Sequence, residues 1–211
     1  MSYRLRGHGP DPGPTPYDFE RHVDDLGQVI DDLTPAVVGG ISLGAHIVAT
    51  WAATVSPPPW MRGLALALPA WMGEPDSIAA ANTNQAREIE RMGVAACLGR
   101  LAADLAGSDA AWVSEEMAAT WREHDETAFC AVLDAVAISH APSADQLARI
   151  VLPIGISAVV DDPLHPSAIA HQWSAATPSA VVTELTIAAC GADRSLIGES
   201  AMAALDASES R

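Results

Sequence analysis

A serine stands between two glycines in the stretch Gly40-Ile41-Ser42-Leu43-Gly44. A short apolar run at 36–38 precedes it, and an alanine-rich segment at about 43–54 follows and is typical of a helix. A strand, a tight turn and a helix in this order are typical of a nucleophile elbow, which exposes a serine hydroxyl. Glycines suit such a turn because larger side chains beside the serine would clash with neighbouring backbone. The alternative is a purely structural turn between a strand and a helix.

A serine hydroxyl is a weak nucleophile until a neighbouring base takes its proton. The elements around the elbow must therefore bring a base and its orienting acid to the same place. Three further apolar runs are predicted strands, at 62–71, 150–162 and 180–191. They are continuous rather than alternating, which favours a parallel sheet covered on both faces.

Helical patterns alternate with these strands. Apolar residues at offsets of 0, 4, 7, 11 and 14 from Phe19 predict a helix, with Asp18 as its N-cap. Further helices are predicted at 166–177 and 195–207. The order of strands and helices predicts an α/β fold, with a mostly parallel sheet flanked by helices.

A long segment at 73–147 separates the second and third predicted strands, and it has helical patterns near 77–105, 109–121 and 124–138. We therefore expect a core made of 1–72 and 148–211, with 73–147 inserted as a helical lid. The apolar residues of this insert pack it onto the sheet, line a pocket, or do both.

The chain resembles the α/β-hydrolase fold family over essentially its whole length. The resemblance rests on "LRGHG" at 5–9, "GGISLGAH" at 39–46, "RGLALALPAW" at 62–71 and "VDDPLHP" at 160–166. It implies that Ser42 is the nucleophile, that the Leu43 N–H is one oxyanion-hole donor, and that Asp162 rather than Asp161 orients a histidine.

Two departures from the family pattern bear on activity. The usual position of the catalytic histidine, after the last strand, holds Ala192, and no histidine lies beyond His171. The family also has strands ahead of the LRGHG segment, one of which supplies a second oxyanion donor. The resemblance therefore implies an N-terminally shortened core whose elbow strand is an unpaired sheet edge.

Another histidine has to replace the missing base if the serine is to react. His165 is the candidate, because it follows Asp162 by three residues in the acid loop and can approach from the correct side. We expect His46, one helical turn beyond Ser42, to pack in the core, and His8 to be structural. His140 at the end of the insert is the remaining alternative, and the last three histidines are expected on helix surfaces: His22, His124 and His171.

The amino-acid composition limits the classes of partner that the protein can bind. The net charge is −16 and every basic residue is arginine, which argues against binding the phosphates of nucleic acid. The three cysteines have no C-x-x-C spacing, and no phosphate-binding loop, dinucleotide motif or metal signature occurs, so no cofactor and no metal are expected. No apolar run approaches the roughly 18 residues of a membrane span, and the N-terminus has no signal-like apolar region, so we expect a cytoplasmic protein.

Three functions remain open from the sequence. The first is a serine hydrolase that acts on an ester, a lactone or a similar acyl compound. The second is a catalytically impaired, non-hydrolytic relative that binds a small apolar ligand. The third is a truncated chain whose native form starts upstream of Met1. The partner in the first two cases is a small molecule, and an exposed strand edge favours a homodimer.

Overall fold

The computed structural model describes residues 1–210, which form two compact units. One unit comprises Met1–His22 and Ser77–Ser139, and the other comprises Val23–Asp76 and the described residues 140–210. The boundary between them falls within the first helix, α1 (Phe19–Leu33). Asp18 accepts the N–H of Arg21 at 2.9 Å at the start of this helix, as its predicted capping role requires.

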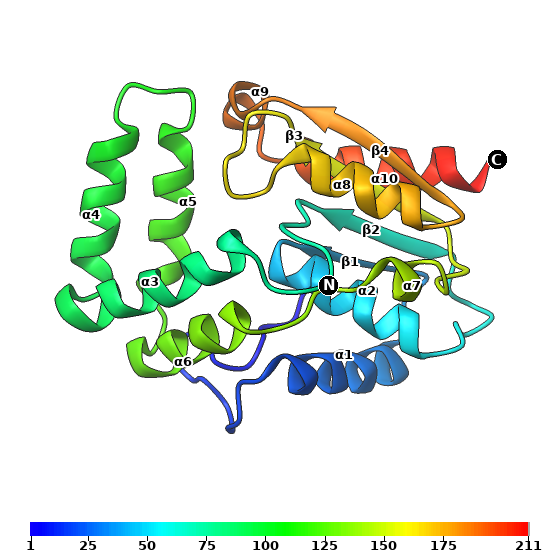
Figure 1. Ribbon diagram of the computed structural model, residues 1–211, viewed down its shortest axis with the longest axis horizontal. Coiled ribbons are helices and arrows are strands. Elements are labelled where there is room, and N and C mark those ends of the chain that lie inside the picture. Colours follow the sequence, from blue (N-terminus) through cyan, green and yellow to red (C-terminus); the bar gives the residue numbers. More distant parts are fainter. Residues whose placement is uncertain (211) are drawn as a thin grey trace. The chain divides into compact units, whose positions relative to one another are not determined.

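The first unit is helical (Figure 1). Its helices are α3 (Ser77–Met92), α4 (Val94–Leu105), α5 (Ala111–Trp121) and α6 (Glu126–Ala137). Helix α3 packs on α6, and α4 packs on α5. The residues at its centre include Ile89, Leu98 and Phe129. All four helices fall within the predicted insert, 73–147. The compact unit that contains them comprises Ser77–Ser139 together with Met1–His22. That it acts as a lid stays a prediction.

The second unit holds a four-stranded sheet in which every neighbouring pair is parallel. Its strands are β1 (Val37–Ile41), β2 (Gly63–Ala67), β3 (Ile154–Val159) and β4 (Ala180–Leu185), and they lie in the order β1-β2-β3-β4. The central strands β2 and β3 are buried almost throughout, as their continuous apolar sequences predict. In residues 1–210, β1 is an end strand of the sheet, which agrees with the expected unpaired edge.

Helices cover both faces of the sheet. Helices α2 (Leu43–Thr54), α7 (Ala144–Leu147) and α8 (Ser167–Ala176) each precede the next strand of the sheet, and α10 (Leu196–Glu209) follows β4. Successive right-handed crossovers in one direction put the connecting helices on the same face. In Figure 1, α2 and α8 accordingly lie in front of the sheet and α10 lies behind it. Helix α10 approaches so closely that a Cβ on Gly155 of β3 would lie 2.0 Å from the Ala201 carbonyl oxygen.

One predicted element differs from the structure. The strand expected at 180–191 ends at Leu185, and the next residues form a short helix, α9 (Ile187–Ala192). Thr186 caps this helix by accepting the N–H of Ala189. An apolar run does not reveal such a change of period, because short buried helices and buried strands have the same composition.

Candidate active site

Ser42 occupies the turn between β1 and α2, at the carboxyl end of the parallel sheet. Its backbone has φ 51° and ψ −117°, an unusual conformation for a residue other than glycine. Its N–H donates to the carbonyl of Ala67 at the end of β2 at 2.9 Å, and its carbonyl accepts the N–H groups of Ala45 and His46. The strained turn is therefore fixed to the neighbouring strand and to the first turn of α2.

The two glycines of the motif have different roles. A Cβ on Gly40 would lie 2.3 Å from the carbonyl carbon and oxygen of Gly44, so only glycine fits before the turn. A Cβ on Gly44 would meet no heavy atom within 4 Å outside the backbone of its own helix. A clash with neighbouring backbone therefore requires glycine at position 40, as expected, and does not require it at position 44.

Asp162 lies in the loop between β3 and α8. Its Oδ1 atom accepts the N–H groups of Leu164 at 2.8 Å and of His165 at 3.2 Å, and its Oδ2 atom lies 2.8 Å from Nδ1 of His165. Burial acts to raise the pKa of this carboxyl group. The hydrogen bond and charge of His165 and the two backbone N–H groups outweigh it and lower the pKa from its usual value. The carboxylate is therefore ionised at neutral pH.

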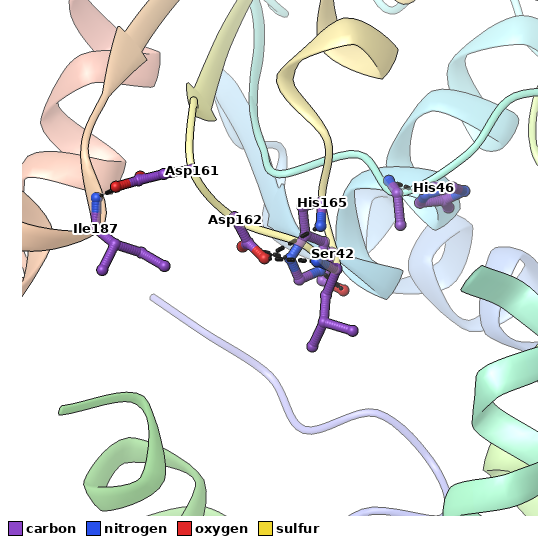
Figure 2. Close-up of polar contacts among 8 residues, drawn as sticks. Ser42, His46, Asp161, Asp162, His165 and Ile187 are labelled. Carbon is purple, nitrogen blue, oxygen red and sulfur yellow. Dashed lines mark hydrogen bonds and ion pairs between the residues drawn. The ribbon is translucent and has the colours of Figure 1, made fainter. Parts of the chain in front are cut away.

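His165 lies between Asp162 and Ser42 (Figure 2). Its Nε2 atom is 2.9 Å from the Oγ atom of Ser42, while its Nδ1 atom faces the carboxylate. Because a carboxylate only accepts hydrogen bonds, the partners assign the proton to Nδ1 and leave Nε2 as an acceptor. The side chains of His165 and Asp162 are 18% and 16% exposed, so bulk water screens this pair only in part.

These three residues have the contacts of a nucleophile, a base and an orienting acid. The acid and the base come from one loop, three residues apart, and the serine comes from a strand two positions away in the sheet. Leu43 begins α2, so its N–H has no carbonyl acceptor within the helix and is available beside the serine. Such a constellation can attack a carbonyl carbon and stabilise the resulting oxyanion.

Neighbouring residues take other roles. Asp161 accepts the N–H of Ile187 at 2.8 Å, so it anchors the loop on α9 and lies apart from the histidine, as Figure 2 shows. Ala192, at the family's usual histidine position, ends α9 at an exposed site. The histidine that contacts Ser42 therefore lies at a different position in the chain from the family's usual histidine.

The remaining histidines lie elsewhere. His46 is fully buried on α2, as expected. His140 lies 3.4 Å from Glu74, and the exposed His171 bonds Glu184. His22, which we expected at the surface, is fully buried in the helical unit, where His8 also lies. That expectation was wrong, because a charge-rich helix such as α1 still has a buried face.

Residues 1–210 hold neither a candidate metal site nor a candidate membrane span. No group of three or more histidine, cysteine, aspartate or glutamate residues in this range could hold a metal ion. In the same range no helix is both long enough and apolar enough to cross a membrane.

Comparison with known proteins identifies the family. The family model described as "Alpha/beta hydrolase family" matches residues 1–205, which is nearly the whole chain. The chain belongs to the alpha/beta hydrolase family. A comparison with curated protein sequences found no match.

Solved structures of alpha/beta hydrolases resemble the chain closely in fold and weakly in sequence. A hydrolase from Pseudomonas aeruginosa is 22% identical with a TM-score of 0.68, and the match covers 95% of this chain and 77% of that one. A thermophilic esterase from Thermogutta terrifontis is 16% identical with a TM-score of 0.74, covering 97% and 78%. An enol-lactonase from Burkholderia xenovorans is 18% identical with a TM-score of 0.71, covering 96% and 78%. At these identities the likeness shows the fold alone.

Proposed function

We propose that this alpha/beta hydrolase is a serine hydrolase that cleaves an ester, a lactone or a related acyl compound. The observation that carries the proposal is the 2.9 Å contact between His165 Nε2 and Ser42 Oγ, with Asp162 on the other ring nitrogen. The solved esterase and enol-lactonase of the same fold support this class of substrate.

The reaction follows from the contacts. The Ser42 oxygen attacks the carbonyl carbon while its proton passes to Nε2 of His165, and the carboxylate of Asp162 stabilises the imidazolium that forms. The Leu43 N–H donates to the developing oxyanion. His165 then gives the proton to the alcohol oxygen of the substrate. The alcohol leaves, and the acyl group stays bonded to the Ser42 oxygen. His165 next takes a proton from a water molecule whose oxygen attacks the acyl carbon. It then returns that proton to the Ser42 oxygen as the carboxylic acid leaves.

Hydrolysis of p-nitrophenyl acetate by the purified protein tests the proposal. We expect turnover by the wild type and by Ser56→Ala, a control at an exposed serine outside the site. We expect turnover by Ser42→Ala to fall to the rate of the buffer. Equal turnover by Ser42→Ala and the wild type would refute the proposal.

A non-hydrolytic relative that binds a small apolar ligand is the second candidate, and the observation that favours it is Ala192 at the usual histidine position. A folded wild type without activity on acetate, butyrate and lactone substrates would support this second function. Calorimetric titration with small apolar esters would then measure binding directly.

A further inference from the structure

His46 is a buried histidine that the proposed reaction does not use. It lies on α2 one helical turn after Ser42, and its side chain has no exposed surface. Its Nε2 atom accepts the N–H of Ala70 at 3.0 Å. Its ring packs against two indoles, with centroids 4.3 Å from Trp71 and 5.1 Å from Trp173. Figure 2 shows His46 apart from the contacts that join Ser42, His165 and Asp162.

The bond to Ala70 helps to hold the segment that runs from Ala67, the last residue of β2, to Ala70. At the start of the segment, the Ala67 carbonyl accepts the N–H of Ser42 at 2.9 Å. In the middle, Leu68 donates its N–H to the Ser157 carbonyl at 2.9 Å and has a positive φ of 54°. Because leucine rarely adopts this conformation, external bonds must hold the segment in it.

The elbow helix therefore contacts the segment at both ends, through Ser42 at one end and His46 at the other. The segment is also bonded to β3, the strand whose following loop carries Asp162 and His165. The position of the serine relative to its base thus depends on this connection between α2, the segment and β3.

We propose that His46 is a positioning residue for the proposed reaction, because by accepting the Ala70 N–H it fixes the Ser42 hydroxyl relative to Nε2 of His165. This inference rests on the proposed function. A displacement of about 1 Å between reacting groups can lower a rate by about 10²-fold. His46 does not contact the reacting atoms and acts through the segment and the elbow.

Packing alone does not account for a histidine at this position. Because Nε2 accepts a hydrogen bond, the ring carries its proton on Nδ1, and that buried atom has no hydrogen-bond partner within the described part of the chain. A phenylalanine or leucine would fill the space without burying an unpaired N–H. The acceptor nitrogen is what the histidine adds.

The charge state of His46 suits the same role. Burial, followed by the charge of His165, lowers the pKa of His46 to about 3, so the ring stays neutral and keeps its acceptor. A neutral ring also avoids placing a second positive charge near His165 when that residue holds the proton of the serine.

Substitutions at position 46 distinguish the effect of the hydrogen-bond acceptor from the effect of side-chain packing. His46→Phe keeps an aromatic ring without an acceptor, while His46→Gln and His46→Leu are close in size and differ in the acceptor. His171→Phe makes the same chemical change at an exposed histidine and serves as the control. For ester hydrolysis, we expect Phe and Leu at 46 to lower kcat by about 10- to 100-fold with KM changed less than about twofold. We expect His46→Gln to retain most of kcat and His171→Phe to match the wild type.

A second readout does not depend on activity. The His165 Nδ1 proton bonded to Asp162 should give a resolved low-field signal in the proton NMR spectrum of the wild type. We expect Phe and Leu at 46 to shift or broaden this signal, because His165 loses its aligned serine partner, while circular dichroism stays native. His46→Gln should leave the signal in place.

The outcomes divide clearly. A native kcat together with a native His165 signal in either the Phe or the Leu variant would overturn the inference. A loss of kcat in the Gln variant equal to that in the Phe and Leu variants would also overturn it, because it would indicate that His46 acts through packing. A wild type without hydrolysis would contradict the proposed function, and the NMR comparison would still decide whether His46 positions the serine and histidine.

Discussion

At the scale of single residues, the decisive feature is a histidine that shares a loop with its own acid. The motif around Ser42 and the aspartate–proline loop identify two members of the site from the sequence. The sequence also made His165 a candidate by its distance of three residues from Asp162. It could not show that Nε2 reaches Ser42, because that contact depends on how the loop after β3 crosses β2 towards β1.

Two adjacent carboxylates test the role of the acid. Asp162 bonds His165, whereas Asp161 bonds the N–H of Ile187. We expect Asp162→Asn to lower kcat for ester hydrolysis by about 10⁴-fold, because the amide no longer fixes the ring tautomer or stabilises the imidazolium. Asp161→Asn, which keeps an acceptor oxygen, should change kcat less than about threefold. Steady-state kinetics on both variants gives the comparison, and similar losses in the two would assign the effect to the loop as a whole.

At the scale of elements, the position of Ser42 depends on how closely α2 approaches β1. The strand–turn–helix pattern predicted this unit and its helix bounds from the sequence alone, and the structure places the helix at Leu43–Thr54. The sequence did not show which glycine the turn requires, because that depends on the three-dimensional path of the chain. Nor did it show that His46 accepts the N–H of Ala70, a bond between residues 24 positions apart.

Alanine substitutions at the two glycines of the elbow, Gly40 and Gly44, test the packing of the turn. We expect Gly40→Ala to lower the free energy of unfolding by at least about 2 kcal/mol, because the added carbon would collide with the Gly44 backbone. We expect Gly44→Ala to leave it unchanged or raise it by up to about 1 kcal/mol, since the added carbon meets open space in a helix. Urea unfolding followed by circular dichroism measures both changes, and a tolerated Gly40→Ala would contradict the packing described for the elbow.

At the scale of the whole molecule, the buried His46 and the half-buried His8 and His124 couple the free energy of unfolding to pH. Burial lowers the pKa of His8 and His124 in the helical unit and brings that of His46 in the sheet unit to about 3. The unfolded chain takes up protons on these residues near pH 6.5, while the folded chain resists them. Their effect is absent well above pH 6.5 and destabilises the fold progressively as the pH falls below it.

We therefore expect the free energy of unfolding to be lower at about pH 5 than at about pH 7.5. The pKa of Asp162 is lowered in the folded chain, so the stabilisation from its ionised form is lost only in more acidic solution than about pH 5. High salt in both samples screens the repulsion that arises from the net charge of −16. Urea unfolding at the two pH values measures the difference, and equal or greater stability at about pH 5 would contradict the prediction.

The central claim is that His165 activates Ser42, and covalent labelling by a fluorophosphonate tests it most directly. Intact-mass spectrometry of the wild type should show one label per chain. Ser42→Ala should show none, His165→Ala should label far more slowly, and His171→Ala should label like the wild type. Loss of label in His165→Ala with native circular dichroism is the result that the account predicts. Equal labelling rates for His165→Ala and the wild type, or a folded wild type that takes no label, would contradict it.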